Sequence, residues 1–229
     1  EVPTGGGDNG TVVWVTNLNE SGAGSLRQAI LDLVSTTANP NPPAVIIKFQ
    51  VGGTINLTSS IDVSEKANFT IAGETAPSPG ITLNGGGTLD MLLELRTTNA
   101  IIRHLRLRNS GTTGIQIWGR SRTVIDHCSI SGCGGNAIVL NGGSPGITIS
   151  RCLIYNNGNV TRTYGYEVCW HHNLFANNGE MTVFRGGPRL DIRNNIFKNW
   201  TGKGIDFGAT HRGVNFINNY FLNSANFFP

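Results

Sequence analysis

The chain has 229 residues, about the size of one large domain, and a net charge of only +3 at pH 7. Charged residues make up 14% of the sequence, and no apolar run reaches the roughly 18 residues that a membrane-spanning helix needs. These features argue against a membrane span and against the basic field that attracts nucleic acids. The 31 glycines and the many Asn, Val, Ile and Thr residues indicate a turn-rich all-β protein.

Short strands punctuated by Gly, Pro and Asn are predicted over the first hundred residues, in TVVWVTNL, PAVIIKFQVGGTINL and ANFTIAGETAPSPGITL. Between the first two lies SLRQAILDLV, in which Ser25 and Gln28 have capping-box spacing and the apolar residues share one face. This pattern predicts an amphipathic helix over about residues 25–35. We expect it to cover strand edges that would otherwise be open at this end of the fold.

From about residue 97 to residue 225 the sequence repeats at intervals of 21 to 24 residues. Such a period, built from short strands and turns, predicts a solenoid in which each repeat is one coil of a parallel β-helix, about 4.8 Å above the last. A leucine-rich repeat has a similar period, but its spaced Leu consensus is absent. We name one set of equivalent positions the reference column; it reads Leu105, Cys128, Cys152, Asn173, Asn195 and Asn219. The column two residues later reads Leu107, Ile130, Ile154, Phe175, Phe197 and Phe221. Further apolar columns lie three and five residues before the reference column.

Stacking of this kind explains why the later repeats contain a paired Asn followed by Phe. We expect the amide of each stacked Asn to hydrogen-bond to the Asn of the next coil at a bend of the chain. Each Phe then fills the core beside it.

The four cysteines are Cys128, Cys133, Cys152 and Cys169. Their number and spacing fit neither a disulfide scaffold of this length nor a zinc motif. Because two of them fall on the inward reference column, we expect buried thiols rather than metal ligands.

Several motifs, in order along the chain, resemble those of the secreted pectate lyases: VTNLNESGAGSLRQAI, IAGETAPSPGITL, AIIRHLRLR, VIDHCSIS and HHNLFAN. The resemblance runs from about Thr11 to the C-terminus. It implies one domain over residues 1–229, folded as a right-handed parallel β-helix with a capping helix and an asparagine ladder, in a secreted, extracellular protein. Six Asn-x-Ser/Thr glycosylation candidates are compatible with secretion; they are Asn9, Asn19, Asn56, Asn68, Asn159 and Asn199.

The resemblance also implies a chemistry, β-elimination of polygalacturonate, in which calcium neutralises the substrate carboxylate and an Arg removes the adjacent proton. Asp126 matches a calcium ligand of the family, but the two further carboxylate positions hold Gly135 and Val139. Calcium prefers six to eight oxygen ligands, so this site looks incomplete and no cofactor is expected. The position of the catalytic Arg holds Met181, and Arg185 matches the second Arg of that segment with a slip of one residue.

A substrate-binding Lys of the family also lacks a counterpart, although Arg162 is nearby. Asp126 and Arg185 remain the candidate catalytic residues. We expect stacked coils to bring Asp126 near Arg103 and Ser150, with His171 one coil further on. The alternatives are a solvated surface with one Asp–Arg pair and a degenerate sugar-binding or catalytic strip.

The candidate substrate-binding residues, which would attract an acidic glycan, are Arg103, Arg106, His171 and Arg189. Glu180 and Asp191 are a further candidate acid/base pair, as in a glycosidase. Trp118 and Trp200, if exposed, would offer stacking platforms to sugar rings, whereas the column of Trp170 places it in the core.

Two classes of function remain open. The first is an extracellular, non-catalytic protein that binds polysaccharide or assembles, since the coil before the terminal SANFFP lacks a predicted cap and a homo-oligomer or filament would cover it. The second is a polysaccharide lyase or glycoside hydrolase with a relocated site. The expected partner in both classes is an acidic polysaccharide, with no nucleic acid.

Overall fold

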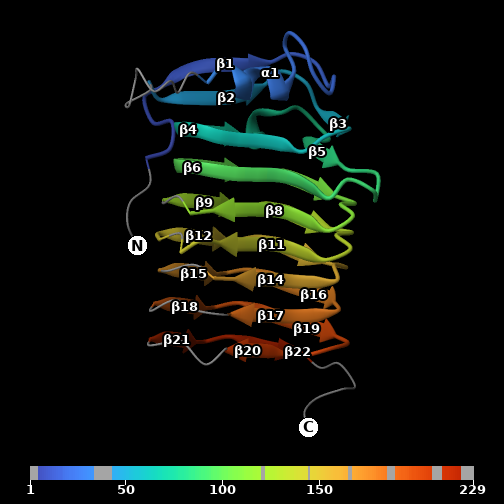
Figure 1. Ribbon diagram of the computed structural model, residues 1–229, viewed down its shortest axis with the longest axis vertical. Coiled ribbons are helices and arrows are strands. Elements are labelled where there is room, and N and C mark those ends of the chain that lie inside the picture. Colours follow the sequence, from blue (N-terminus) through green and yellow to red (C-terminus); the bar gives the residue numbers. More distant parts are fainter. Residues whose placement is uncertain are drawn as a thin grey trace.

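The protein is a parallel β-helix, in which the chain winds through successive coils stacked along one axis (Figure 1). The computed structural model describes residues 5–33, 43–119, 122–143, 145–164, 167–184, 189–207 and 213–222. Each strand pairs in parallel with its counterparts in the neighbouring coils, from β1 and β2 at one end to β20, β21 and β22 at the other. The predicted all-β solenoid is confirmed.

The strands form three faces, which we name after one strand of each. The β8 face contains β8 (Thr113–Trp118), β11 (Asn136–Asn141), β14 (Asn159–Thr163), β17 (Glu180–Phe184) and β20 (Ile205–Phe207). The β9 face contains β1 (Thr11–Val15), β2 (Val45–Phe49), β9 (Thr123–Asp126), β12 (Ile147–Ser150), β15 (Val168–His171), β18 (Leu190–Arg193) and β21 (Val214–Ile217). The β10 face contains β3 (Gly53–Asn56), β5 (Ile81–Asn84), β7 (Leu105–Arg108), β10 (Ser129–Ser131), β13 (Leu153–Tyr155), β16 (Leu174–Asn178), β19 (Ile196–Trp200) and β22 (Tyr220–Leu222).

Two long strands, β4 (Ile61–Ala72) and β6 (Met91–Arg103), run across both the β8 and the β9 face. They show that regular stacking begins well before residue 97, where the sequence repeat becomes visible. Parallel pairing is already present between β1 and β2 and between β3 and β5. The repeat is hidden there because the early coils have strands and turns of unequal length.

The predicted columns are confirmed residue by residue. Ile125, Ile149, Trp170 and Ile192 are lateral neighbours on the β9 face and are fully buried. On the β10 face Phe175, Phe197 and Phe221 are likewise neighbours. Their rings stack with centroids 4.8 and 5.0 Å apart, so the core is built from like side chains repeated along the axis.

The Asn column forms a continuous buried ladder. The Oδ1 atom of Asn195 accepts from both the backbone N–H and the side-chain Nδ2 of Asn173, each at 3.0 Å. Its own Nδ2 donates to the Trp170 carbonyl at 2.9 Å and to Asn219 Oδ1 at 3.0 Å. One amide side chain therefore satisfies two backbone groups of the preceding coil, one on each side of its bend, that would otherwise be left unpaired.

A second ladder, which the sequence reasoning missed, lies at the next bend. Asn157 Nδ2 donates to Asn178 Oδ1 at 3.0 Å, and Asn157 Oδ1 accepts from the backbone N–H of Cys133 at 3.0 Å. The signal was present in the sequence as the paired asparagines at 156–157 and 177–178.

The two residues of each Asn pair have different roles. The first residue has a positive φ, as in Asn177 (54°), Asn194 (55°) and Asn218 (52°), and it turns the chain. The second, such as Asn195, points inward and carries the ladder. Asn tolerates the left-handed conformation better than most residues because its short polar side chain bonds locally, which explains the doubled Asn.

All four cysteines are buried thiols, as expected. Cys152 takes a ladder position, where its backbone N–H donates to Asn173 Oδ1 at 2.9 Å and its thiol donates to the Ser150 carbonyl at 3.2 Å. Burial, with the neighbouring Cys128, raises the pKa of the Cys152 thiol well above its usual value. The thiol therefore stays protonated and acts as a donor where an Asn amide would.

The predicted helix is shorter than its expected span of 25–35. The helix α1 (Leu26–Leu31) begins after Ser25, whose hydroxyl accepts from the backbone N–H of Gln28 at 3.1 Å. It lies beside β1 at the N-terminal end of the stack (Figure 1) and buries Leu26, Ala29 and Ile30. Its capping role stays a prediction.

We expect Asn195→Ala to lower the free energy of unfolding by about 3 kcal/mol, because it leaves the Asn173 N–H and the Trp170 carbonyl buried without partners. Denaturant unfolding measures this change. The matched control is Asn56→Ala, which removes an exposed Asn–Asn bond to Asn84 and should cost less than about 0.5 kcal/mol. Equal losses in the two variants would contradict the ladder's role.

At the turn position, we expect Asn194→Ala to destabilise the protein by about 1 kcal/mol, because Ala adopts the left-handed backbone conformation less favourably than Asn. Asn194→Gly should be closer to the parent, since Gly adopts positive φ without strain. Thermal unfolding of the two variants side by side measures the difference. An Ala variant as stable as the Gly variant would refute this account of the first Asn.

Candidate functional site

The β9 face presents two outward columns, and most of the predicted site residues lie there. The outer column, as we name it, contains Arg103, Asp126, Ser150, His171 and Arg193 on successive coils. The inner column contains Val124, Thr148, Cys169, Asp191 and Asn215. The expected proximity of Asp126 to Arg103, Ser150 and, one coil further, His171 is therefore confirmed in register.

Asp126 is the best-connected side chain of the outer column. Its Oδ1 accepts from Ser150 Oγ at 2.5 Å and lies 3.4 Å from Arg151 Nη1, while its Oδ2 lies 2.6 Å from His127 Nδ1. Partial burial alone would raise the pKa of this carboxyl. The hydrogen bonds from Ser150 and His127 and the charges of His127 and Arg151 outweigh burial and lower the pKa below its usual value. Asp126 is thus an ionised, fully engaged carboxylate.

The neighbouring cations and imidazoles are also paired. Arg103 bonds to Glu74 with Nη2 and Oε1 2.6 Å apart, rather than to Asp126. The ring of His127 stacks on that of His104 at 4.7 Å. His171 Nδ1 lies 2.9 Å from His172 Nδ1. Arg103 is therefore neutralised by a partner that lies 29 positions away in sequence, which the repeat could not reveal.

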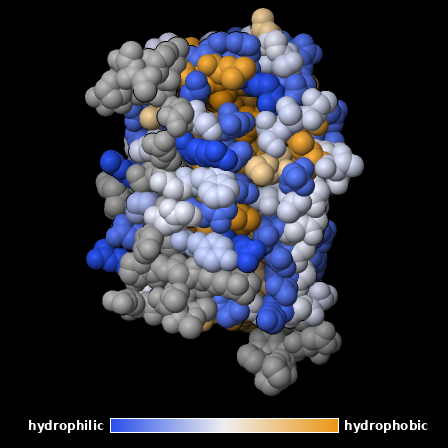
Figure 2. Space-filling model, viewed as in Figure 1, coloured by the Kyte–Doolittle hydropathy of each residue, from blue (hydrophilic) through white to orange (hydrophobic). Residues whose placement is uncertain are grey.

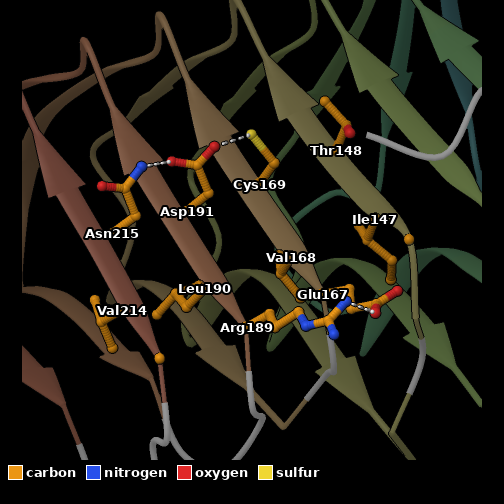
Figure 3. A pocket seen from close by; sticks show the side chains of 12 residues that line it. Ile147, Thr148, Glu167, Val168, Cys169, Arg189, Leu190, Asp191, Val214 and Asn215 are labelled. Carbon is orange, nitrogen blue, oxygen red and sulfur yellow. Dashed lines mark hydrogen bonds and ion pairs between the residues drawn. The ribbon is translucent and has the colours of Figure 1, made fainter.

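A groove of about 650 Å³ runs beside the inner column (Figure 3). One wall carries the polar row of Thr148, Cys169, Asp191 and Asn215, and the other carries Glu167 and Arg189. The Arg189 Nη1 atom donates to Glu167 Oε1 at 2.9 Å. Asp191 accepts from the Cys169 thiol at 3.5 Å and from Asn215 Nδ2 at 2.9 Å.

The two carboxylates proposed as an acid/base pair lie on different faces. Glu180 is the first residue of β17 on the β8 face, whereas Asp191 lies on β18 in the groove. The groove lining contains Asp191 but not Glu180. Arg106 also lies apart, on the β10 face, where its Nε donates to Thr82 Oγ1 at 2.8 Å.

The residues at Asp126 do not fit a calcium ion. Val139, at one of the matching ligand positions, lies on β11 of the β8 face and not beside Asp126. The oxygens of Asp126 face a hydroxyl, an imidazole and a guanidinium. Within the described ranges, no three His, Cys, Asp or Glu side chains come together to hold a metal. A hard cation needs several oxygen ligands, so we derive no step through calcium.

The residue that the resemblance matches to the family's catalytic Arg lies in the core. Met181 is fully buried, so no side chain here reaches a substrate. Arg185 lies outside the described residues, and its catalytic role stays a prediction.

An aromatic column on the β8 face is a feature that the sequence reasoning found only in part. Trp118 and Asn141 are lateral neighbours, and the Tyr164 backbone N–H, one coil on, donates to the Leu140 carbonyl at 2.7 Å. We name Trp118, Asn141 and Tyr164 the aromatic column. Trp118 is 37% exposed, as expected. Tyr164 was not predicted, because the columns recognised in the sequence do not lie on this face.

A guanidinium lies over each ring of the aromatic column. Arg96 is 5.5 Å from the Trp118 ring centroid, and Arg162 is 5.5 Å from that of Tyr164. Arg96 also bonds to Glu94 at 2.6 Å. Arg162 donates to the Tyr164 hydroxyl at 2.9 Å and is exposed. No carboxylate pairs with it in the part of the chain that the structure describes.

The prediction that Trp200 offers a second stacking platform is wrong. Its exposure is only 7% and it belongs to the core. Trp200 follows the positive-φ residue Asn199, as Asn178 follows Asn177, and so takes an inward ladder position. Trp170 is fully buried, as expected.

The glycosylation candidates differ in exposure. Asn9, Asn19 and Asn56 are exposed, whereas Asn68, Asn159 and Asn199 are half-buried. Their modification stays a prediction. The side of the molecule seen in Figure 2 is largely hydrophilic with small hydrophobic patches, and none of the helices described has the length and apolar character to cross a membrane.

Comparison with known proteins agrees with this geometry. The family described as "Right handed beta helix region" matches residues 55–225. Proteins named "Probable pectate lyase C" from Aspergillus fumigatus and Aspergillus oryzae are 34% and 32% identical over an alignment of 231 positions, which covers 95% of this chain and 51% of each relative. The chain thus spans about half the length of the curated relatives it matches.

Solved structures share the fold at low sequence identity. The cedar pollen allergen jun a 1 superposes with a TM-score of 0.72 at 20% identity, covering 97% of this chain and 80% of the allergen. A pectate lyase of Bacillus sp. N165, in complex with trigalacturonate, gives 0.65 at 19%, covering 98% and 88%. The family match over residues 55–225, together with the stacked parallel strands, shows that the chain belongs to the family of right-handed β-helix proteins.

Proposed function

We propose that the protein is an extracellular β-helix that binds an acidic polysaccharide without cleaving it by the calcium-and-arginine reaction. The observation that carries this proposal is the aromatic column with its two guanidinium groups. Sugar rings stack on aromatic faces, and Arg162, which has no carboxylate partner among the described residues, attracts a uronic-acid carboxylate. Trp118 and Tyr164 lie two coils apart, about 9.6 Å along the axis, so one extended glycan chain can contact both.

The absence of a cleaving apparatus at Asp126 supports the non-catalytic half of the proposal. Proton removal next to a carboxylate needs charge neutralisation and a base together. Among the residues that the structure describes, no group of three His, Cys, Asp or Glu side chains surrounds Asp126. Met181, which the resemblance matches to the family's base, is buried.

A lyase or hydrolase with a relocated site is the second candidate. The groove favours it, because Glu167, Arg189 and Asp191 face one cavity, and relatives that share a third of the sequence are named pectate lyases. Assembly into a homo-oligomer is a further proposal, supported by exposed Phe216 and Tyr220 on the last described coil and checked by size measurement of the native protein.

We expect Trp118→Ala to weaken binding of polygalacturonate about tenfold, equivalent to about 1.4 kcal/mol, because it removes the stacking surface. Affinity electrophoresis through gels containing the polymer measures this change. The matched control is Trp14→Ala, since Trp14 is 44% exposed with Lys48 5.8 Å from its ring centroid but lies outside the column. A loss of equal size in both variants would count against the aromatic column.

Arg162→Gln should weaken the same binding, and raising the ionic strength should weaken the parent more than the variant, because a screened charge contributes less. The comparison uses the same gels at low and high salt. Unchanged salt sensitivity in the variant would show that Arg162 does not contact the acidic groups.

With polygalacturonate and calcium, we expect no unsaturated product above the protein-free blank when ultraviolet absorbance is followed. An active pectate lyase serves as the positive control. Turnover that is abolished by Asp126→Asn or by Arg185→Gln would contradict the proposal and show that the protein is a lyase.

A further inference from the structure

The groove on the β9 face carries a second ligand site, separate from the aromatic column. We propose that it binds a neutral, hydroxyl-rich oligosaccharide of about three sugar units along the helix axis. The site is built from the polar row Thr148, Cys169, Asp191 and Asn215 and from the opposite wall of Glu167 and Arg189 (Figure 3).

The shape of the groove suits a saccharide. Its volume of about 650 Å³ lies within the range of small-molecule sites. Between the polar walls Val214 is 39% exposed, and the buried Ile147, Val168 and Leu190 add only a small apolar area, so the lining combines some apolar carbon with hydrogen-bonding edges (Figure 3). Sugars have the same division, with apolar C–H faces and hydroxyl groups around the ring edge.

The spacing of the polar row sets the orientation of the ligand. Thr148, Cys169, Asp191 and Asn215 are direct neighbours in the ladder and repeat about every 4.8 Å. A glycan lying along the axis therefore meets a new polar side chain at each coil. The row ends on the N-terminal side, where the same column holds Val124 and Ile101. The ligand is thus limited to the coils between β12 and β21.

The charge balance favours a neutral ligand over a charged one. Glu167 is paired with Arg189 at 2.9 Å, and Asp191 with Arg193 Nε at 3.4 Å. Each carboxylate thus has a guanidinium beside it. An acidic sugar would face Glu167 and Asp191, and a basic sugar would face both guanidinium groups. Hydroxyl groups can donate to the carboxylates and accept from Asn215 and Arg189, and a neutral ligand leaves both ion pairs in place.

Cys169 gives a direct test because it lies in the groove. It is 7% exposed, against 1–2% for the other three cysteines, so a small thiol reagent should label it first. The experiment measures the rate of Cys169 labelling, mapped by peptide mass spectrometry, in the presence of trisaccharides. The panel contains β-1,4-linked trimers of glucose, mannose, xylose and galactose, with trigalacturonate and chitosan trimer as charged comparisons.

We expect at least one neutral trimer to slow Cys169 labelling fivefold or more, and the charged trimers to slow it less. Titration calorimetry with that trimer should show about a fivefold loss of affinity in Thr148→Val and in Arg189→Ala, whose side chain is 77% exposed and dispensable for folding. Thr54→Val, the same substitution on the exposed edge of the β10 face, should leave affinity unchanged.

Three results would overturn the proposal. They are an absence of protection by every neutral trimer, protection by trigalacturonate equal to that of the best neutral trimer, or equal affinities in Thr148→Val and the parent. Trp118→Ala should not alter groove binding, and Arg189→Ala should not alter binding of polygalacturonate. Failure of the groove proposal is therefore separate from failure of the acidic-glycan proposal.

Discussion

The coils depend on hydrogen bonds that satisfy buried backbone groups at each bend. A bend interrupts the strand ladder, and an unpaired buried N–H or carbonyl costs about 1–3 kcal/mol. Asn195 removes this cost on both sides, by accepting from Asn173 and donating to the Trp170 carbonyl. Cys152 fills the same place with a protonated thiol. The inward column therefore accepts few side chains, which is why it repeats so visibly.

Fixed inward columns impose fixed outward columns. Because side chains alternate across a strand, locking Ile125 and Ile149 inside places Asp126 and Ser150 side by side on the outer side of the sheet. The same register aligns Trp118 with Asn141 on one face and Cys169 with Asp191 on another. Surfaces that run along the axis are thus a direct result of the ladders, and long, repetitive ligands suit them.

The sequence was sufficient to predict the interior but not the pairing at the surface. Columns such as Phe175, Phe197 and Phe221 could be counted because like residues recur at one spacing. The inward orientation of the Trp200 side chain was not predicted. Which side chains point inward after the second bend depends on the positive-φ residue Asn199, and that conformation has no unique sequence signature. The pairing of Arg103 with Glu74 and the groove depend on turns of irregular length, so spacing alone could not predict them.

The same separation of inward from outward positions explains how a β-helix can keep its fold while its outer residues vary. The ladder and core residues point inward, whereas ligands for calcium would have to stand on outward positions that contribute little to stability. Substitution on the outer side of a strand leaves the inward ladders and the stacked rings in place. A reaction that needs charge neutralisation and a base together fails when one of these groups is exchanged, whereas binding is more tolerant, because each coil contributes its contact nearly independently. A binding surface along the axis of a β-helix therefore tolerates more substitutions than a catalytic site built from several residues.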